Sequence, residues 1–116
     1  MMAGSELGRL QAWYRSHCDG DWEHDSRIAI ITLDNPGWSV NINFTETELE
    51  DRQFQPVEVA RNDMDWVYCW VESNHFNGAG GPQNLTEILG LFLDWSEMKE
   101  VSVSLSAVDV TIEGDG

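Results

Sequence analysis

Residues 27–44 predict a β-hairpin, and this hairpin restricts the range of folds more than any other feature of the chain. The segment WSVNINF (38–44) alternates strictly, so that its apolar residues share one face, beginning with Trp38. The segment RIAIITL (27–33) is largely apolar on both faces, which is typical of a strand inside a sheet. Between them, Pro36 and Gly37 suit a type II turn. We therefore expect an antiparallel hairpin, with 27–33 in a central position and Trp38 buried.

A second pair of strands is predicted by residues 54–61 and 66–72, which flank the turn NDMD. The later strand is apolar on both faces: Val67, Cys69 and Val71 face one way, and Trp66, Tyr68 and Trp70 face the other. Such a strand is either covered on both sides, which is the commoner arrangement, or presents a row of aromatic side chains to a partner.

The N-terminal part of the chain predicts a helix. Ser5 can cap it, and Gly20 can take the left-handed conformation that closes a helix near the end of this segment. The residues expected to share one face of this helix are Leu7, Leu10, Tyr14 and His17.

The rest of the chain predicts a loop, a second helix and a last strand. Residues 73–83 are rich in glycine and are expected to form a flexible loop. Asn84 and Glu87 form an asparagine variant of the capping box at the start of a helix over 85–98. Its apolar stripe is Leu85, Ile88, Leu89, Phe92 and Trp95. Residues 101–112 alternate with a change of phase at Ala107–Val108, which predicts a last strand with a bulge.

These elements predict one α+β domain over residues 1–116. Its sheet is expected to be mainly antiparallel with about five strands, an N-terminal helix and a second helix before the last strand. A chain of 116 residues is long enough to bury a single hydrophobic core.

The charge of the chain limits its partners. It has 21 acidic and 6 basic residues, for a formal net charge of −15. A surface this negative repels nucleic-acid backbones and anionic lipid, so neither is expected as a partner, whereas basic proteins would be attracted. Acidity that only aids solubility is the alternative. No signal peptide or membrane-spanning run is seen, and the two cysteines form no CxxC motif. We therefore expect a cytoplasmic protein with reduced thiols.

The segment CDGDWEH (18–24) concentrates titratable side chains and allows two interpretations. In the first, Asp19, Asp21, Glu23 and His24, together with His75, would form a small metal-dependent or acid–base catalytic site. The spacing argues against it. Counted from Asp19, an EF-hand would need glycine at the position of His24, and HExxH is absent. In the second, the segment is a turn with Trp22 packed inward and carboxylates bonded to the backbone. We expect no catalytic residue, metal or cofactor.

The aromatic content favours a binding function. Six tryptophans are many for 116 residues, and tryptophan and tyrosine dominate binding hot spots at protein interfaces. We expect Trp70 and Trp22 to anchor a partner and the acidic segment 45–53 to steer it. The predicted partner-binding residues are Asp19, Asp21, Trp22, Glu23, His24, Glu46, Glu48, Glu50, Asp51 and Trp70.

Three segments resemble a known family. They are WYRSHCDGDWEH (13–24), ITLDNPGWSVNI (31–42) and GGPQNLTEILGLFLDW (80–95), and the chain resembles the immunity protein 53 family of bacterial polymorphic toxin systems over about residues 10–95. The resemblance implies a cytoplasmic antidote that binds and blocks a cognate toxin encoded beside it. The resemblance does not identify the toxin, although the charge of the chain favours a basic one such as a nuclease. We also expect CDGDWEH and TLDNPGW to lie near each other.

Overall fold

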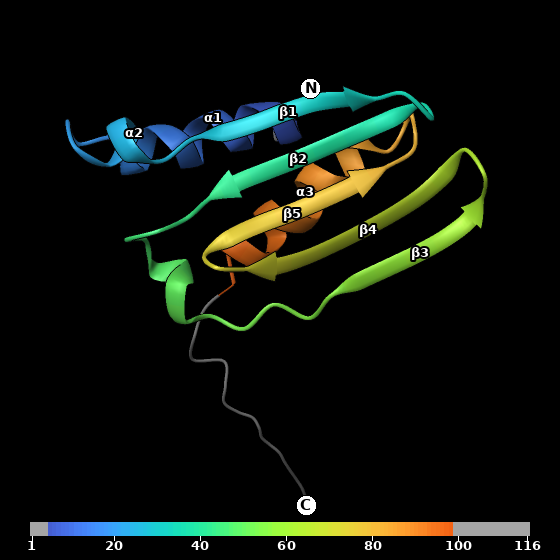
Figure 1. Cartoon of the computed structure of the whole chain (residues 1–116). Helices are drawn as coiled ribbons and strands as arrows, with labels where there is room; N and C mark the ends of the chain where they lie inside the picture. The colour runs from blue at the N-terminus through green and yellow to red at the C-terminus, as the bar shows by residue number, and fades with distance from the viewer. Residues whose placement is uncertain (1–4, 99–116) are drawn as a thin grey trace, which may run out of the picture.

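Five antiparallel strands form one sheet in the computed structural model, which describes residues 5–98 (Figure 1). The strand order is β1-β2-β5-β4-β3. The strands are β1 (Ile28–Leu33), β2 (Gly37–Asn43), β3 (Val57–Asn62), β4 (Asp65–Glu72) and β5 (His75–Gly80). Helices α1 (Glu6–His17) and α3 (Leu85–Ser96) lie on one face of the sheet, and no helix of the described residues covers the other, here called the open face. The predicted α+β class is confirmed, with an antiparallel sheet of five strands, an N-terminal helix and a second helix, α3, later in the chain.

The central strand β5 lies in the segment that was expected to be a loop, so that prediction was wrong. β5 pairs with both β2 and β4. Its glycines face the helix: a β-carbon on Gly78 would lie 2.5 Å from Cγ2 of Ile88, and one on Gly80 would lie 3.0 Å from Cδ1 of Ile88. The glycines therefore let α3 pack directly on the middle of the sheet, a close approach that larger residues would prevent.

The first hairpin forms as predicted, but its position and its turn differ from the expectation. β1 pairs only with β2 and is an edge strand, with Ile31 58% exposed. The turn consists of residues 34–36 with a cis peptide bond before Pro36, and Gly37 already belongs to β2. A β-carbon on Gly37 would collide with the carbonyl oxygen of Gly80. Close contact between β2 and the end of β5, rather than a positive φ, thus requires this glycine.

Helix α1 is capped as predicted but buries a different face. The side chain of Ser5 accepts a hydrogen bond from the backbone N–H of Gly8. Leu10 and Trp13 are the buried residues of the helix, whereas Leu7 and Tyr14 are exposed. The apolar pattern therefore identified the helix, but of its expected inner face only Leu10 is buried, and Trp13 takes the place expected for Tyr14. The helix ends at His17, and Gly20, with φ of 98°, lies in the next turn.

Helix α3 carries most of the core. Its buried residues are Ile88, Leu89, Phe92, Leu93 and Trp95, which confirms the predicted stripe except for Leu85, which is partly exposed. The predicted capping box does not form. The side chain of Asn84 instead accepts from the backbone N–H of Trp66 and donates to the carboxylates of Asp65 and Glu87, so it ties the helix to β4.

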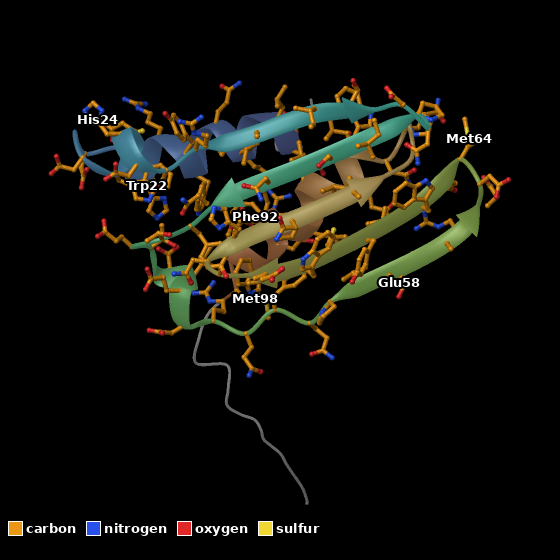
Figure 2. The ribbon with its side chains drawn as sticks, in the orientation of Figure 1. Trp22, His24, Glu58, Met64, Phe92 and Met98 are labelled. Carbon is orange, nitrogen blue, oxygen red and sulfur yellow. The ribbon has the colours of Figure 1, made fainter. Side chains whose placement is uncertain are left out.

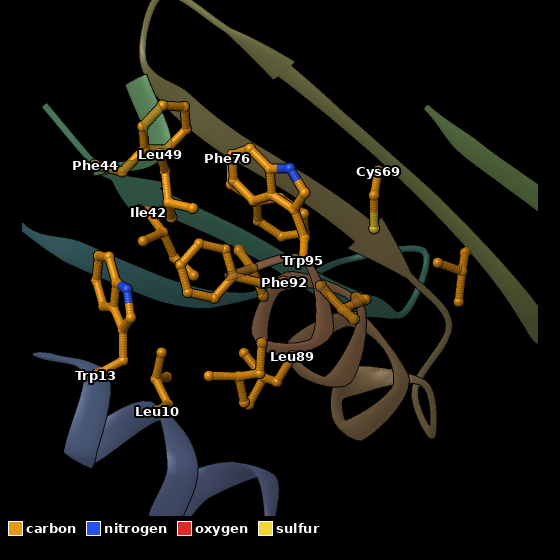
Figure 3. Close-up of a cluster of buried hydrophobic side chains, with 14 of the residues drawn as sticks. Leu10, Trp13, Ile42, Phe44, Leu49, Cys69, Phe76, Leu89, Phe92 and Trp95 are labelled. Carbon is orange, nitrogen blue, oxygen red and sulfur yellow. The ribbon is translucent and has the colours of Figure 1, made fainter. Parts of the chain in front are cut away.

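The core fills the space between the sheet and the helices (Figure 3). Phe92 contacts the ring of Trp13 from α1 and that of Phe76 from β5, so it joins the two helices to the central strand. Trp38 was expected to be buried; it is partly buried at the rim, and its indole N–H donates to the carbonyl oxygen of Pro82 at 3.0 Å. The predicted last strand lies outside the described residues. Within residues 5–98, no helix is long and apolar enough to cross a membrane.

Candidate protein-binding site at the acidic end of the sheet

Two acidic segments that are far apart in the sequence meet at one end of the sheet (Figures 1 and 2). We call residues 19–25, which include the short helix α2 (Trp22–Asp25), the first acidic segment. Residues 46–51, which include the 3-10 helix η1 (Glu48–Asp51), are the second acidic segment. The indole N–H of Trp22 donates to the carbonyl oxygen of Thr45 at 2.8 Å. Nε2 of His17 lies 3.3 Å from a carboxylate oxygen of Glu48. These contacts create one surface, here called the acidic end.

The first acidic segment is a turn held by its own carboxylates. Asp19 accepts hydrogen bonds from the backbone N–H groups of Asp21 (2.9 Å) and Trp22 (3.0 Å). Glu23 accepts from the backbone N–H groups of Asp19 (2.9 Å) and Gly20 (2.8 Å). Trp22 is only 5% exposed, so its side chain is packed into the core and anchors the turn. This arrangement matches the turn interpretation of CDGDWEH.

Backbone hydrogen bonds stabilise the charged form of both turn-holding carboxylates. The N–H groups of Trp22 and Asp21 lower the pKa of Asp19. The N–H of Glu23 itself, followed by those of Asp19 and Gly20, lowers the pKa of Glu23, although desolvation opposes the shift. Both groups therefore stay ionised well below neutral pH.

The second acidic segment is anchored by one apolar side chain. Leu49 is completely buried, while Glu46, Glu48, Glu50 and Asp51 are exposed, as expected for a solvated run. Glu46 has a φ of 64°, and its backbone N–H donates to the carboxylate of Glu50 at 2.6 Å. Thr47 bonds to the carbonyl oxygen of Phe44 and to the N–H of Leu49. The segment is therefore an ordered turn and not a loose connection.

Four carboxylates of the acidic end make no side-chain hydrogen bond or ion pair within residues 5–98. They are Asp21, Asp25, Glu46 and Asp51, and all four are exposed. A hollow of about 130 Å³ between the two segments is lined by Asp25, Thr45 and Glu46, among others, so free carboxylates from both segments border it. We call these four residues the free carboxylates. Of the site residues, Asp25 was not predicted, because it lies one residue after the segment CDGDWEH to which the prediction was confined.

Three arginines of the described chain hold elements together. Arg9 contacts Asp94 and Glu97, both at 3.0 Å, and joins α1 to α3. Arg61 contacts Asp65 and Glu87, while Arg52 donates to the last carbonyls of α3. These three side chains are therefore engaged in joining elements, whereas Arg15 and Arg27 are exposed and make no side-chain hydrogen bond or ion pair within residues 5–98.

The residues of the alternative catalytic site do not assemble. Within residues 5–98, no three histidine, cysteine, aspartate or glutamate side chains come close enough to hold a metal ion. His75 lies on β5 and its Nδ1 is 2.9 Å from the carbonyl oxygen of Ser73. His24 is exposed on α2. Burial raises the pKa of the Cys69 thiol to about 12, so this cysteine is protonated at neutral pH and is not an activated nucleophile.

The predicted aromatic row lies on the open face of the sheet, where no described helix covers it. Tyr68 is 41% exposed, and its ring stacks on that of Trp70 with centroids 4.6 Å apart and an angle of 26°. Of the two arrangements considered for β4, the uncovered one is therefore found among residues 5–98. Trp70 precedes by two residues Glu72, which ends β4. The first residue of β5, His75, lies beside Glu72, since the two residues pair.

The structure thus brings together most of the predicted partner-binding residues. Asp19, Asp21, Glu23 and His24 share the acidic end with Glu46, Glu48, Glu50 and Asp51, and Trp70 lies on the adjoining open face. Trp22 is buried, so we treat it as a support and leave it out of the contact surface. CDGDWEH and TLDNPGW lie at opposite ends of β1, contrary to expectation, because the first precedes this strand and the second begins within its far end.

Comparison with known proteins identifies a family. A family model described as Immunity protein 53 matches residues 7–97, which includes both acidic segments and all five strands. No curated protein and no solved structure matches the chain.

Proposed function

Because the chain belongs to the immunity protein 53 family, we propose that its acidic end binds the basic surface of a cognate toxin domain and blocks that toxin in the cytoplasm. Membership of the family makes the chain an immunity protein. The partner of an immunity protein is a toxin, so the remaining questions are which surface binds and what charge the toxin presents.

The observation that carries the proposal is the convergence of the two acidic segments. The Trp22–Thr45 hydrogen bond brings carboxylates from both segments to one end of the sheet, within a chain of net charge −15. A surface of this kind attracts a basic partner and repels an acidic one. Enzymes that act on nucleic acid carry positively charged clefts, so a nuclease is the toxin class that this surface fits best.

The turn geometry supports different roles for two groups of carboxylates, one structural and one that contacts the toxin. Asp19, Glu23 and Glu50 are bonded to backbone N–H groups and fix the shape of the surface. The free carboxylates project from this framework and are available to arginine or lysine side chains of the toxin. Because the framework is ordered before binding, little conformational entropy has to be lost there on association.

Inhibition would follow from occupation of the toxin's cleft, without chemistry by the immunity protein. Carboxylates held in a positive cleft exclude the phosphate backbone that the cleft evolved to bind. The chain is then a stoichiometric inhibitor and not an enzyme, and one immunity protein neutralises one toxin domain.

Co-expression tests the proposal. The gene beside this one is expected to encode a large protein with a toxin domain at its C-terminus. Expression of that domain alone should stop bacterial growth, and expression with this chain should restore it, with the two proteins purifying as a complex. Purified toxin should lose activity at a 1:1 ratio. Failure of the pair to associate, or rescue without a complex, would contradict the proposal.

A further inference from the structure

The open face of the sheet carries a stacked pair of aromatic side chains on β4. Tyr68 and Trp70 occupy alternate positions of β4, opposite in direction to the buried Val67 and Cys69, and their rings stack at 4.6 Å. Tyr68 is exposed and Trp70 is half-buried, and no helix among residues 5–98 covers them, which is a feature of interaction surfaces. We call these two residues the aromatic platform.

Carboxylates lie on both sides of the platform. Glu58 of β3 is the cross-strand partner of Tyr68 and is exposed, so its side chain lies on the same face as Tyr68. Glu72 is exposed and follows Trp70 by two residues, which places it on the same face at the other end of the pair. An aromatic surface bordered by carboxylates has the features that recognise a guanidinium group: a face for stacking and acceptors for its N–H groups.

The platform continues into the acidic end. His75 pairs with Glu72 on one side and with Asn43 on the other, and the side chain of Asn43 accepts from the backbone N–H of Thr45 at 2.8 Å. Thr45 in turn precedes the second acidic segment and accepts the Trp22 hydrogen bond. A partner seated on the acidic end would therefore extend onto Trp70 without crossing a covered region.

We propose that the aromatic platform binds an arginine side chain of the basic toxin, with the guanidinium stacked on the free outer face of one of the two rings and bonded to the neighbouring carboxylate, Glu58 or Glu72. This inference rests on the proposed function and adds a specific contact to it. The platform distinguishes arginine from lysine, because a planar, weakly hydrated guanidinium stacks on an aromatic ring and a compact, strongly hydrated ammonium group does so less well. The acidic end governs how fast the toxin arrives, and the platform governs how slowly it leaves.

A direct test uses two short peptides of equal length and charge, hexa-arginine and hexa-lysine, titrated into the full chain by calorimetry. The parent should bind hexa-arginine several-fold more tightly than hexa-lysine. In Trp70→Leu and in Tyr68→Leu this preference should fall close to one. Ile31→Ala serves as the matched control, because Ile31 is exposed on the same open face but lies on the edge strand β1, separated from β4 by β2 and β5. Its preference should equal the parent's.

The same variants test the role of the platform in the complex. Dissociation of the cognate toxin should become roughly tenfold faster in Trp70→Leu, as expected for a central aromatic contact, and should be unchanged in Ile31→Ala. Using both platform variants guards against misfolding of one, and melting temperatures identify such a case. If the parent shows no preference for arginine, or if both platform variants keep it, the inference is wrong. If the toxin binds but dissociates from Trp70→Leu at the parent's rate, the role of the aromatic platform is refuted and the proposed function stands. If no complex forms at all, the proposed function is refuted, and the ratio of hexa-arginine to hexa-lysine affinity still tests whether the platform prefers arginine.

Discussion

The indole N–H of Trp22 donates a hydrogen bond to the carbonyl oxygen of Thr45, 2.8 Å away, and this bond joins two acidic segments that the sequence keeps more than twenty residues apart. The ring is buried and packs edge-on against Trp13. Trp22 therefore joins α2 to α1 and to the residues that follow β2. The position of the free carboxylates relative to one another depends on this contact.

Replacing Trp22 with phenylalanine should lower both stability and toxin binding. The substitution keeps an aromatic ring but removes the donor, so the carbonyl of Thr45 loses its partner; the expected cost is about 1–3 kcal/mol in the free energy of unfolding. Because the two acidic segments then lose their direct hydrogen bond, toxin association should also slow. Urea denaturation and stopped-flow binding measure the two effects.

Trp38→Phe is the matched control for this variant. It removes an indole hydrogen bond to a backbone carbonyl, that of Pro82, at the other end of the sheet. A comparable loss of stability is expected, but with unchanged toxin association. If Trp22→Phe and Trp38→Phe reduce toxin association equally, then Trp22 contributes only to stability.

Acid should weaken the turn of residues 19–23 through Asp19. The backbone N–H groups of Trp22 and Asp21 lower the pKa of Asp19 in the folded chain. The folded state therefore binds the proton less readily than the unfolded state, in which the pKa of an aspartate is about 3.9. The stabilisation is therefore complete above the unfolded pKa and is lost as the pH falls through the lower folded value. Asp19→Asn should be less stable than the parent at pH 7, and the difference should shrink on acidification below about pH 4.

Denaturation of parent and Asp19→Asn at several pH values between neutral and acidic measures this difference. Many other carboxylates titrate in the same range, and comparison of the pair removes their common contribution. Asp63→Asn is a suitable control, since Asp63 is exposed in the β3–β4 turn and no side-chain hydrogen bond of Asp63 is found within residues 5–98. A stability difference between parent and Asp19→Asn that stays constant with pH would mean that the Asp19 carboxylate does not hold the turn.

Adding one methyl group in the centre of the sheet should destabilise the protein. In Gly78→Ala the new β-carbon would lie 2.5 Å from Cγ2 of the buried Ile88, so α3 or β5 has to shift. Overpacking of this kind costs about 1–3 kcal/mol. Ile88→Leu removes the methyl group that causes the clash while nearly conserving volume. The double variant should therefore be more stable than the sum of the two single effects implies, with a coupling of at least ~0.5 kcal/mol. Strict additivity would show that β5 and α3 are not in this contact.

The pattern of apolar residues predicted the elements whose side chains alternate or repeat clearly. The β1–β2 hairpin, β4 and α3 were predicted for this reason. β5 was missed because Gly78 and Gly80 remove the apolar signal at the positions where α3 packs closest. A strand that makes room for a helix in this way has the composition of a loop, and only the tertiary contact with Ile88 explains its glycines.

Strand position and the shape of the site depended on contacts that a single sequence does not encode locally. RIAIITL suggested a central strand, yet β1 is at the edge, and Ile31 is exposed on the open face. The turn in CDGDWEH was foreseen from the tendency of short carboxylates to bond to nearby backbone N–H groups. Its contact with Thr45 was not, because that hydrogen bond joins residues that are 23 positions apart in the sequence.

The most direct test of the acidic end is the association rate of the cognate toxin with variants that each remove two charges. Asp21→Asn with Asp25→Asn neutralises the first segment, and Glu46→Gln with Asp51→Asn neutralises the second. These four carboxylates make no side-chain bond within residues 5–98, so melting temperatures should match the parent's. The control pair, Asp34→Asn with Asp63→Asn, removes two exposed charges from turns at the opposite end of the sheet.

Stopped-flow measurements over a range of salt concentrations give the rate and its salt dependence for each pair. Both acidic-end pairs should associate several-fold more slowly than the parent at low salt, with a shallower dependence on ionic strength, because they weaken the local field that steers the toxin. The control pair should stay close to the parent. Equal slowing by all three pairs would show that only net charge matters, and unchanged rates for both acidic-end pairs would show that the toxin binds elsewhere.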